Sequence, residues 1–282
     1  MLTSPGLNQG VLDIMKLTKA LEADPVRALV MGMPGSGKSS LVAKLAESGI
    51  RLKWIDLENS ISVLQKLPTA AMDNVDVMSV RDSASYPIAA ETMLVLFKEG
   101  KVHACNKHSK HNCPLCKPLG AVEFTDIDFS TMTKQDCLVL DSSSQLSASL
   151  LANITKGRPT ESKPDRDDWG SLRKYTEFFT SQFQACPVNL IVIAHAMEAS
   201  MEDNKVKIVP IFGSATASAN FAKAFNDVIY TEVKNKKHVA YSSSVATMNI
   251  ITKSRSDFDI EKLAVASLLP LFKSVAAAVA GQ

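Results

Sequence analysis

Residues 27–49 read RALVMGMPGSGKSSLVAKLAESG. The apolar run 27–32 predicts a buried strand, and residues 35–49 predict a helix that ends at Gly49. Between them, residues 32–39 fit the pattern G-x-x-x-x-G-K-[ST] at every fixed position. Its glycines let successive backbone N–H groups point at one anion, and the helix N-terminus adds positive partial charge. The stretch therefore predicts a phosphate-binding loop between a strand and a helix.

This loop is expected to bind Mg²⁺ and a triphosphate. Lys38 reaches the β- and γ-phosphates, and the Ser39 hydroxyl ligates the metal. Asp141, which ends the apolar run CLVLD, is expected as the second Mg²⁺ ligand, unless it only caps the next helix. The residues assigned to nucleotide binding are Gly32, Pro34, Gly35, Ser36, Gly37, Lys38, Ser39 and Ser40.

Glu58 is the best candidate for the group that orients the attacking water. Many P-loop ATPases place a glutamate directly after the metal-binding aspartate, but Ser142 follows Asp141 here. Glu58 ends the strand predicted after the phosphate loop, where its carboxylate can face the γ-phosphate. The alternative is an exposed glutamate at a strand end.

Strand-length apolar runs alternate with helix-length segments along the chain. This alternation predicts an α/β fold with a mostly parallel sheet covered by helices on both faces. After Phe225, two short strands predict an antiparallel extension of that sheet. The expected strands are 27–32, 51–58, 137–141, 189–194, 227–233 and 246–253, with helices at 8–23, 35–49 and 61–67. We divide the chain into an N-terminal helical segment (1–26), a core (27–260) with an insertion at about 98–126, and an apolar C-terminal helix (261–282).

These motifs together resemble the RecA-like P-loop ATPase core. The matching segments are WIDLENS (54–60), CLVLDSSSQL (137–146), NLIVIAHAM (189–197) and NIITKSRSD (249–257). The resemblance implies that Glu58 and Asp141 are catalytic and that His195 senses the γ-phosphate, although His195 could instead be a core histidine. It also implies that Lys253 and Arg255 act on the nucleotide of a neighbouring subunit, the alternative being a solvated basic strand end.

Within this superfamily, the chain most resembles phage nucleotide-binding proteins of the single-strand annealing recombinase type. These are bare RecA-like cores with an Asp-Trp-Gly segment, which stands here at residues 168–170. The resemblance implies ATP and Mg²⁺ as cofactors, a homo-oligomer or filament, and single-stranded DNA as partner, with a single-stranded-DNA-binding protein as a further partner. Hydrolysis would then occur at subunit interfaces, and the expected location is the host cytoplasm.

The same resemblance places DNA contacts in two segments, about 156–170 and 197–218. Both carry basic side chains, but the first also carries acids, so a solvated linker is the alternative. Trp169 can stack on a base or pack in the core. The expected contacts are Lys156, Arg158, Lys163, Arg166, Trp169, Lys205 and Lys207.

The insertion contains the run KVHACNKHSKHNCPLCKPLG, residues 101–120. Cys105 and His108 form one pair with two intervening residues, and Cys113 and Cys116 form another, which is typical of tetrahedral zinc sites. His103 or His111 could replace His108 as the fourth ligand. The run carries four lysines and no acid, so it suits either a zinc-stabilised loop or a basic surface for phosphate backbones.

Composition excludes several other classes. The 282 residues are 46% hydrophobic and 21% charged, which is too apolar for a disordered chain. The net charge is only +2, so the chain as a whole lacks the strong positive charge that would indicate nucleic-acid binding. We find no signal-peptide pattern and no apolar run of the ~20 residues that span a bilayer, so a soluble cytoplasmic protein without membrane contact is expected. Two rival functions stay open: a non-hydrolysing nucleotide switch or zinc adaptor, and a small-molecule phosphotransferase.

Overall fold

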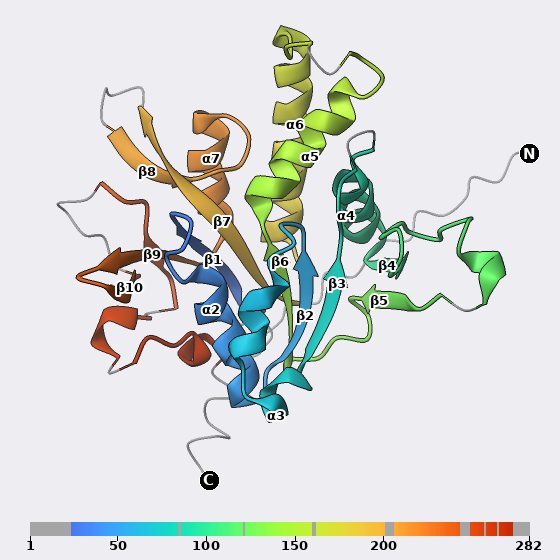
Figure 1. The fold of residues 1–282 in the computed structure, drawn as a ribbon. Helices are drawn as coiled ribbons and strands as arrows, with labels where there is room; N and C mark the ends of the chain where they lie inside the picture. Colours follow the sequence, from blue (N-terminus) through green and yellow to red (C-terminus); the bar gives the residue numbers. More distant parts are fainter. Residues whose placement is uncertain are drawn as a thin grey trace, which may run out of the picture.

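The computed structural model describes residues 24–83, 86–120, 122–159, 162–200, 206–242, 249–256, 258–263 and 265–272. Their centre is a nine-stranded sheet whose main path has the order β10-β9-β1-β7-β6-β2-β3 (Figure 1). The strands on this path are β1 (Arg27–Gly32), β2 (Arg51–Asp56), β3 (Val75–Ser79), β6 (Asp136–Asp141), β7 (Asn189–Ser200), β9 (Asp227–Lys234) and β10 (Lys237–Tyr241). Two further strands, β8 (Val206–Pro210) and β11 (Lys253–Ser254), pair with β7 and β9.

The sheet is mostly parallel, as predicted. β1 pairs in parallel with both β7 and β9, and β6 pairs in parallel with both β7 and β2. β10 and β11 pair with β9 in the antiparallel sense. The predicted antiparallel extension differs in detail: β9 itself is parallel to β1, and its antiparallel neighbour β10 was not among the predicted strands. Parallel pairing brings the carboxyl ends of β1, β2 and β6 to one edge of the sheet, where ligands bind in such folds.

Helices cover both faces because alternate residues of each buried strand point to opposite sides. Leu29 and Met31 of β1 pack into the cluster formed with α4, α5, α6 and α7, whereas Ala28 and Val30 pack into the cluster on the α2 side. The α-helices are α2 (Lys38–Ala43), α3 (Thr69–Met72), α4 (Ile88–Glu99), α5 (Ser143–Thr155), α6 (Arg166–Gln184) and α7 (Ala215–Phe221). No helix among the described residues has the length and hydrophobicity needed to cross a bilayer.

Two predicted helices are shorter or tighter than expected. The helix after the phosphate loop is α-helical only over α2, continues as a 3₁₀ helix over Lys44–Ser48, and ends at Gly49 in the left-handed conformation. Residues Ile61–Lys66 form a 3₁₀ helix instead of an α-helix. Leu67, which follows, is extended, because Pro68 disfavours the α conformation in the residue before it.

Both segments predicted as DNA-contacting loops contain regular structure. α6 begins at Arg166, because the Asp165 carboxylate accepts a hydrogen bond from the Asp168 N–H and the Asp168 carboxylate accepts one from the Asp165 N–H. The Asp-Trp-Gly segment therefore lies in the first turns of a helix. The segment at 197–218 contains the end of β7, its antiparallel partner β8 and the start of α7.

The Cys/His insertion projects from one side of the sheet (Figure 1). It is bounded by a two-stranded antiparallel ribbon of β4 (Lys101–Cys105) and β5 (Phe124–Asp128). We call residues 105–124 the Cys/His lobe.

Several predicted terminal elements lie wholly or partly outside the described residues. These include the helix at 8–23 and residues 246–248 of the strand predicted at 246–253. In the described part of that predicted strand, only Lys253 belongs to a strand, β11, so the strand is much shorter than predicted. Of the predicted C-terminal helix, the described part contains 3₁₀ turns at Ile260–Lys262 and Leu269–Leu271 that pack on the α2 side of the sheet.

Candidate active site

The phosphate loop connects β1 directly to α2. Gly35 and Gly37 have φ angles of 75° and 93°, which favour glycine over residues with a side chain. A Cβ atom on Gly32 would lie 2.3 Å from the Thr231 carbonyl oxygen, so this position also requires glycine. Ser36 Oγ and Thr231 Oγ1 lie 2.8 Å apart, which ties the loop to β9. The backbone thus has the curled shape that the motif predicts.

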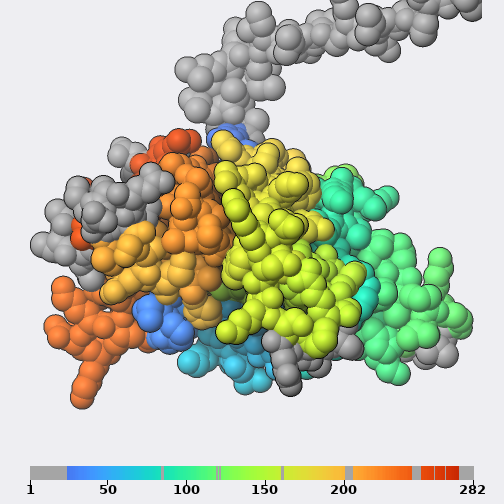
Figure 2. All heavy atoms as spheres, turned by 90° about the horizontal axis from the view of Figure 1, so that it is seen from above, coloured from blue at the N-terminus to red at the C-terminus, as the bar shows by residue number. Residues whose placement is uncertain are grey.

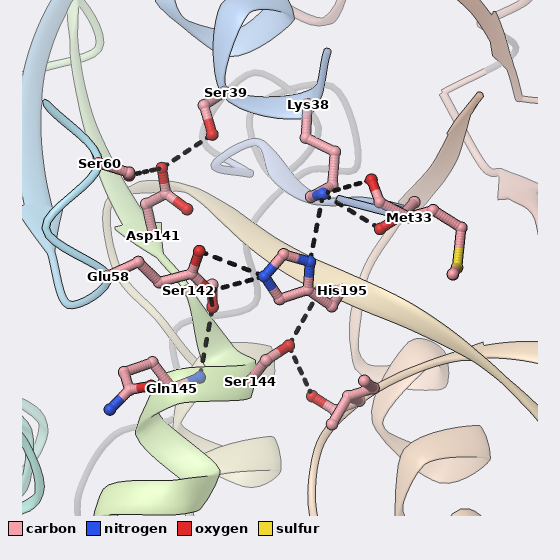
Figure 3. A network of polar contacts seen from close by, with 12 residues as sticks. Met33, Lys38, Ser39, Glu58, Ser60, Asp141, Ser142, Ser144, Gln145 and His195 are labelled. Atoms are coloured by element: carbon pink, nitrogen blue, oxygen red, sulfur yellow. Dashed lines mark hydrogen bonds and ion pairs between the residues drawn. The ribbon is translucent and has the colours of Figure 1, made fainter. Parts of the chain in front are cut away.

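Lys38 is folded back on its own loop. Its ammonium donates hydrogen bonds to the carbonyl oxygens of Gly32 (3.1 Å) and Met33 (3.0 Å) and lies 3.5 Å from His195 Nδ1 (Figure 3). Burial lowers the pKa of Lys38, against the opposite effect of the Glu58 and Asp141 carboxylates. The ammonium therefore lies beside the acids at the sheet edge.

Ser39 and Asp141 meet as a hydroxyl–carboxylate pair. Ser39 Oγ donates a hydrogen bond to Asp141 Oδ2 at 2.9 Å, and Ser60 Oγ lies 3.4 Å from the same oxygen. Burial raises the pKa of Asp141 to about 6, and the nearby Glu58 and Asp56 carboxylates add to this effect. A hydroxyl and a buried carboxylate in contact are a donor set that fits Mg²⁺.

Glu58 contacts His195 and Ser142. Its carboxylate accepts a hydrogen bond from Ser142 Oγ, and its two oxygens lie 3.1 and 3.2 Å from His195 Nε2 (Figure 3). Burial acts to raise the pKa of Glu58, but hydrogen bonds from His195 and Ser142 outweigh it and hold this pKa below its usual value. Ser144 Oγ accepts a hydrogen bond of 2.9 Å from the His195 N–H and so fixes the backbone at this point.

The structure therefore brings Lys38, Ser39, Glu58, Asp141 and His195 together. Two of them belong to α2, one follows β2, and the others lie on β6 and β7. All five lie along one edge of the sheet. A triphosphate on the loop would meet a cation, a metal-binding pair and a carboxylate able to orient water.

Asp56 belongs to the same edge, and the sequence reasoning missed it. Its Cα is paired with that of Asp141 between β2 and β6, and the residue is fully buried. Asp56 Oδ1 accepts hydrogen bonds from the N–H groups of Glu58 (3.2 Å) and Ser60 (3.0 Å). The available signal was a charged residue directly after the apolar pair Trp54–Ile55 near the end of a predicted strand.

The β9–β10 hairpin was also missed as a neighbour of the phosphate loop. A Cβ atom on Gly37 would lie 2.9 Å from His238 Nδ1, so the imidazole lies directly beside the loop. In Figure 2 the loop (blue) is exposed between this hairpin (orange) and the segment after β2 (light blue). Because Gly37 and His238 are far apart in the sequence, no local pattern predicts that they are neighbours.

Lys253 and Arg255 do not join the cluster. Lys253 on β11 pairs with Val228, near the start of β9, whereas the phosphate loop adjoins Thr231, farther along that strand. The Lys253 ammonium donates hydrogen bonds to the carbonyl oxygens of Lys223 (3.2 Å) and Phe225. Burial lowers the pKa of Lys253, and the neighbouring Arg255 contributes. Lys253 and Arg255 thus lie away from the phosphate loop.

The predicted DNA-contacting residues have different surroundings. Arg158 makes two hydrogen bonds, of 2.5 and 2.9 Å, to the buried Asp168 carboxylate, which ties it to the start of α6. Trp169 is 48% exposed. Lys156, Lys163 and Arg166 are exposed, and Lys207 is half-buried on β8. Lys205 lies outside the described residues.

The Cys/His lobe gathers one set of metal ligands. The ligand atoms of Cys105, His108, Cys113 and Cys116 all lie within 4.8 Å of one another, and His108 Nδ1 is 3.1 Å from Cys116 Sγ. The three sulfurs are buried, and their number and type fit a tetrahedral Cys₃His zinc site.

The other two candidate histidines face elsewhere. His103 contacts the Asp126 carboxylate and stacks on Phe124 with ring centroids 4.3 Å apart. His111 Nδ1 accepts a hydrogen bond of 3.1 Å from the His103 N–H. Among the three histidines, His108 is the one placed to complete the ligand set.

Comparison with known proteins gives one family. The sequence model of a family described as "AAA domain" matches residues 24–256. No curated protein matches the chain. Among solved structures, one similar chain is an ATPase from the type III secretion system of pathogenic bacteria, with 12% sequence identity and a TM-score of 0.40. The match covers 73% of this chain and 51% of that ATPase, so the chain spans about half its length.

Proposed function

Since the chain belongs to the AAA domain family, we propose that it is a RecA-like, Mg²⁺-dependent ATPase that binds single-stranded DNA and acts in phage-type recombination or strand annealing. The observation that carries the proposal is the contact network at the sheet edge, where Lys38, His195 and Glu58 adjoin the Ser39–Asp141 pair. Together these groups can bind a nucleotide, hold its metal and activate water.

The chain's own residues account for binding. Backbone N–H groups of the phosphate loop bind the phosphates, and Lys38 exchanges its two carbonyl partners for phosphate oxygens. Ser39 and Asp141 would hold Mg²⁺, which supplies charge neutralisation on the phosphates when bound. The Asp141 carboxylate must be ionised for this role.

Glu58 would orient the attacking water and accept its proton. Its lowered pKa keeps the carboxylate ionised at neutral pH, and the contacts with Ser142 and His195 fix its direction. His195 contacts Lys38 through Nδ1 and Glu58 through Nε2, so it can report the loss of the γ-phosphate to both groups. Water attacks the γ-phosphorus, and the bond to the ADP oxygen breaks.

Assembly would complete the site. Lys253 and Arg255 lie away from the nucleotide edge of their own subunit, so their proposed role requires a neighbour in a homo-oligomer or filament. Exposed basic side chains at Lys156, Lys163 and Arg166 support a DNA contact beyond the end of α5. The Cys₃His ligand set supports zinc as a structural metal of the lobe.

The proposed function is tested by ATP hydrolysis measured with and without single-stranded DNA. We expect Mg²⁺-dependent turnover that rises with single-stranded DNA and is lost in Glu58→Gln. A matched variant, Glu47→Gln, removes an exposed glutamate after α2 and should retain turnover. Binding of ATP without turnover, even with DNA present, would instead indicate a nucleotide switch. Turnover indifferent to DNA would refute the DNA-dependent part of the proposal.

A further inference from the structure

The ring of Tyr86 joins three segments that are distant in the sequence. Lys110 of the Cys/His lobe places its ammonium 4.7 Å from the ring centroid, and Lys156, just after α5, places its ammonium 5.9 Å away. Lys110 Nζ also lies 3.4 Å from the Tyr86 hydroxyl. Ammonium groups are attracted to an aromatic face, so the ring holds the two lysines near one another despite their like charge.

The lobe is fixed to the same edge of the sheet as the nucleotide site. Ser109 Oγ donates a hydrogen bond of 2.5 Å to the carbonyl oxygen of Ser79, the last residue of β3. Thr92 Oγ1 on α4 donates one of 3.1 Å to the Ser109 carbonyl oxygen. Seen from above, the lobe (green) lies next to the end of the α5–α6 pair (yellow-green) in Figure 2.

The Cys/His lobe carries more positive than negative side chains: three lysines (Lys107, Lys110 and Lys117) against one acid, the exposed Glu123. Lys107, Lys117 and Lys156 are exposed, and none forms an ion pair with another described residue. Two acids close to Tyr86 in the sequence are engaged internally: Glu91 contacts the Tyr86 hydroxyl, and Asp82 accepts a 2.8 Å hydrogen bond from the Ala89 N–H at the start of α4. A polyanion is therefore the partner that this surface fits.

We propose that Tyr86, Lys110 and Lys156 form a binding surface for single-stranded DNA that joins the Cys/His lobe to the end of α5. When DNA binds, the ammonium groups of Lys110 and Lys156 leave the Tyr86 ring and contact backbone phosphates. The ring face that the lysines vacate then stacks on a base. Stacking on aromatic rings combined with cationic contacts to the backbone is how proteins bind single strands without reading sequence. The inference rests on the proposed function and assigns its DNA contact to named side chains.

The test is the binding of a fluorescein-labelled oligothymidylate to the full chain, followed by anisotropy at several salt concentrations. Each phosphate contact contributes about 0.7 to the slope of log affinity against log salt for single strands, so Lys110→Ala/Lys156→Ala should flatten the slope by up to ~1.4. Tyr86→Ala should weaken binding roughly 5- to 100-fold through lost stacking, and Tyr86→Phe should restore it. Lys44→Ala, at an exposed lysine after α2, is the control and should bind like wild type.

Zinc content and Mg·ATP binding should be unchanged in every variant, which shows that each one is folded. Wild-type binding and slope in both Tyr86→Ala and the lysine double variant would overturn the inference alone. Absence of DNA binding by the wild-type chain would overturn the proposed DNA function along with it.

Discussion

Asp56 carries a fully buried carboxylate whose Oδ2 atom has no hydrogen-bond partner among the described residues. Burying a polar oxygen without a hydrogen-bond partner is unfavourable, so such a group persists where its other contacts require it. Here Oδ1 accepts the N–H groups of Glu58 and Ser60, which fixes the turn after β2. Glu58 faces His195, and Ser60 faces Asp141. We infer that Asp56 positions the water-orienting glutamate.

Asp56→Ala should lower the turnover number roughly 10- to 100-fold, because a displaced catalytic group loses its reactive geometry. The KM for ATP should change little, since the hydrogen bonds of Asp56 go to Glu58 and Ser60 and not to the phosphate loop. Asp56→Asn retains an oxygen acceptor and should recover most of the activity.

Combining Asp56→Ala with Glu58→Gln distinguishes a role of Asp56 in positioning Glu58 from a general role in protein stability. In that background, Asp56→Ala should cause no further loss of turnover, because the residue it positions is already inactive. Losses that add fully in a steady-state assay would show that Asp56 acts independently of Glu58.

Asp141 makes the stability of the nucleotide-free protein depend on pH. Burial raises its pKa from 3.8 to about 6. Between these values the folded protein binds more protons than the unfolded chain, so this contribution to stability falls as the pH rises. Above the folded pKa, the ionised carboxylate costs on the order of 2–3 kcal/mol unless a cation joins it.

Asp141→Asn should therefore raise the Tm of the nucleotide-free protein, and more so at about pH 8 than at about pH 4, because the amide does not titrate. Thermal unfolding of both proteins at the two pH values measures this difference. The same variant should lose Mg²⁺-dependent nucleotide binding. An equal change in Tm at both pH values would contradict the assignment of the titration to Asp141.

At the scale of elements, the Cys/His lobe has little apolar material of its own. Its buried cluster consists of three cysteines, with Val122 and Phe124 packed against them. A core this small does not hold a loop in one conformation without a cross-link or a metal. The lobe is therefore the element whose order we expect to depend on zinc.

His108→Ala should lower the zinc content of the purified protein well below one ion per chain, whereas His111→Ala should retain it. The two substitutions remove the same side chain three residues apart, and the structure places only the first among the sulfur ligands. Metal analysis by mass spectrometry distinguishes them. Equal zinc content in the two variants would refute the assigned ligand set.

Local signals explain what the sequence predicted correctly about these elements. The phosphate loop follows from glycine positions, and β1, β6 and the start of β7 follow from uninterrupted apolar runs. The capping pair Asp165–Asp168, which starts α6 inside a polar stretch, was overlooked although its spacing is local. The spacing of Cys105 and His108 already favoured His108 as the fourth ligand, with His103 and His111 as alternatives. The contacts of Asp56 and His238 depend on how distant segments meet, which spacing along the chain does not encode.

At the scale of the whole molecule, the separation of Arg255 from the phosphate loop has a consequence for assembly. Arg255 follows β11, which pairs with the start of β9, whereas the loop adjoins a later part of β9. An arginine that acts on bound nucleotide from this position must reach a different subunit. Such a residue contributes about 10³- to 10⁵-fold to turnover in related chemistry.

Mixing two inactive variants tests this arrangement. Lys38→Ala subunits should bind no nucleotide but retain Arg255, whereas Arg255→Ala subunits should bind nucleotide but lack the cation. An equimolar mixture should recover part of the wild-type turnover, because some bound nucleotides then face an intact Arg255. A mixture as inactive as its components, or wild-type turnover in Arg255→Ala alone, would rule out action across the interface.

The central claim is that the loop at residues 32–39 binds a magnesium-bound triphosphate. Isothermal titration calorimetry with Mg·ATP tests it most directly, with Lys38→Ala as the comparison. The account predicts saturable heat for the wild-type chain and none for the variant. No heat for the wild-type chain, or the same heat for both proteins, would contradict it.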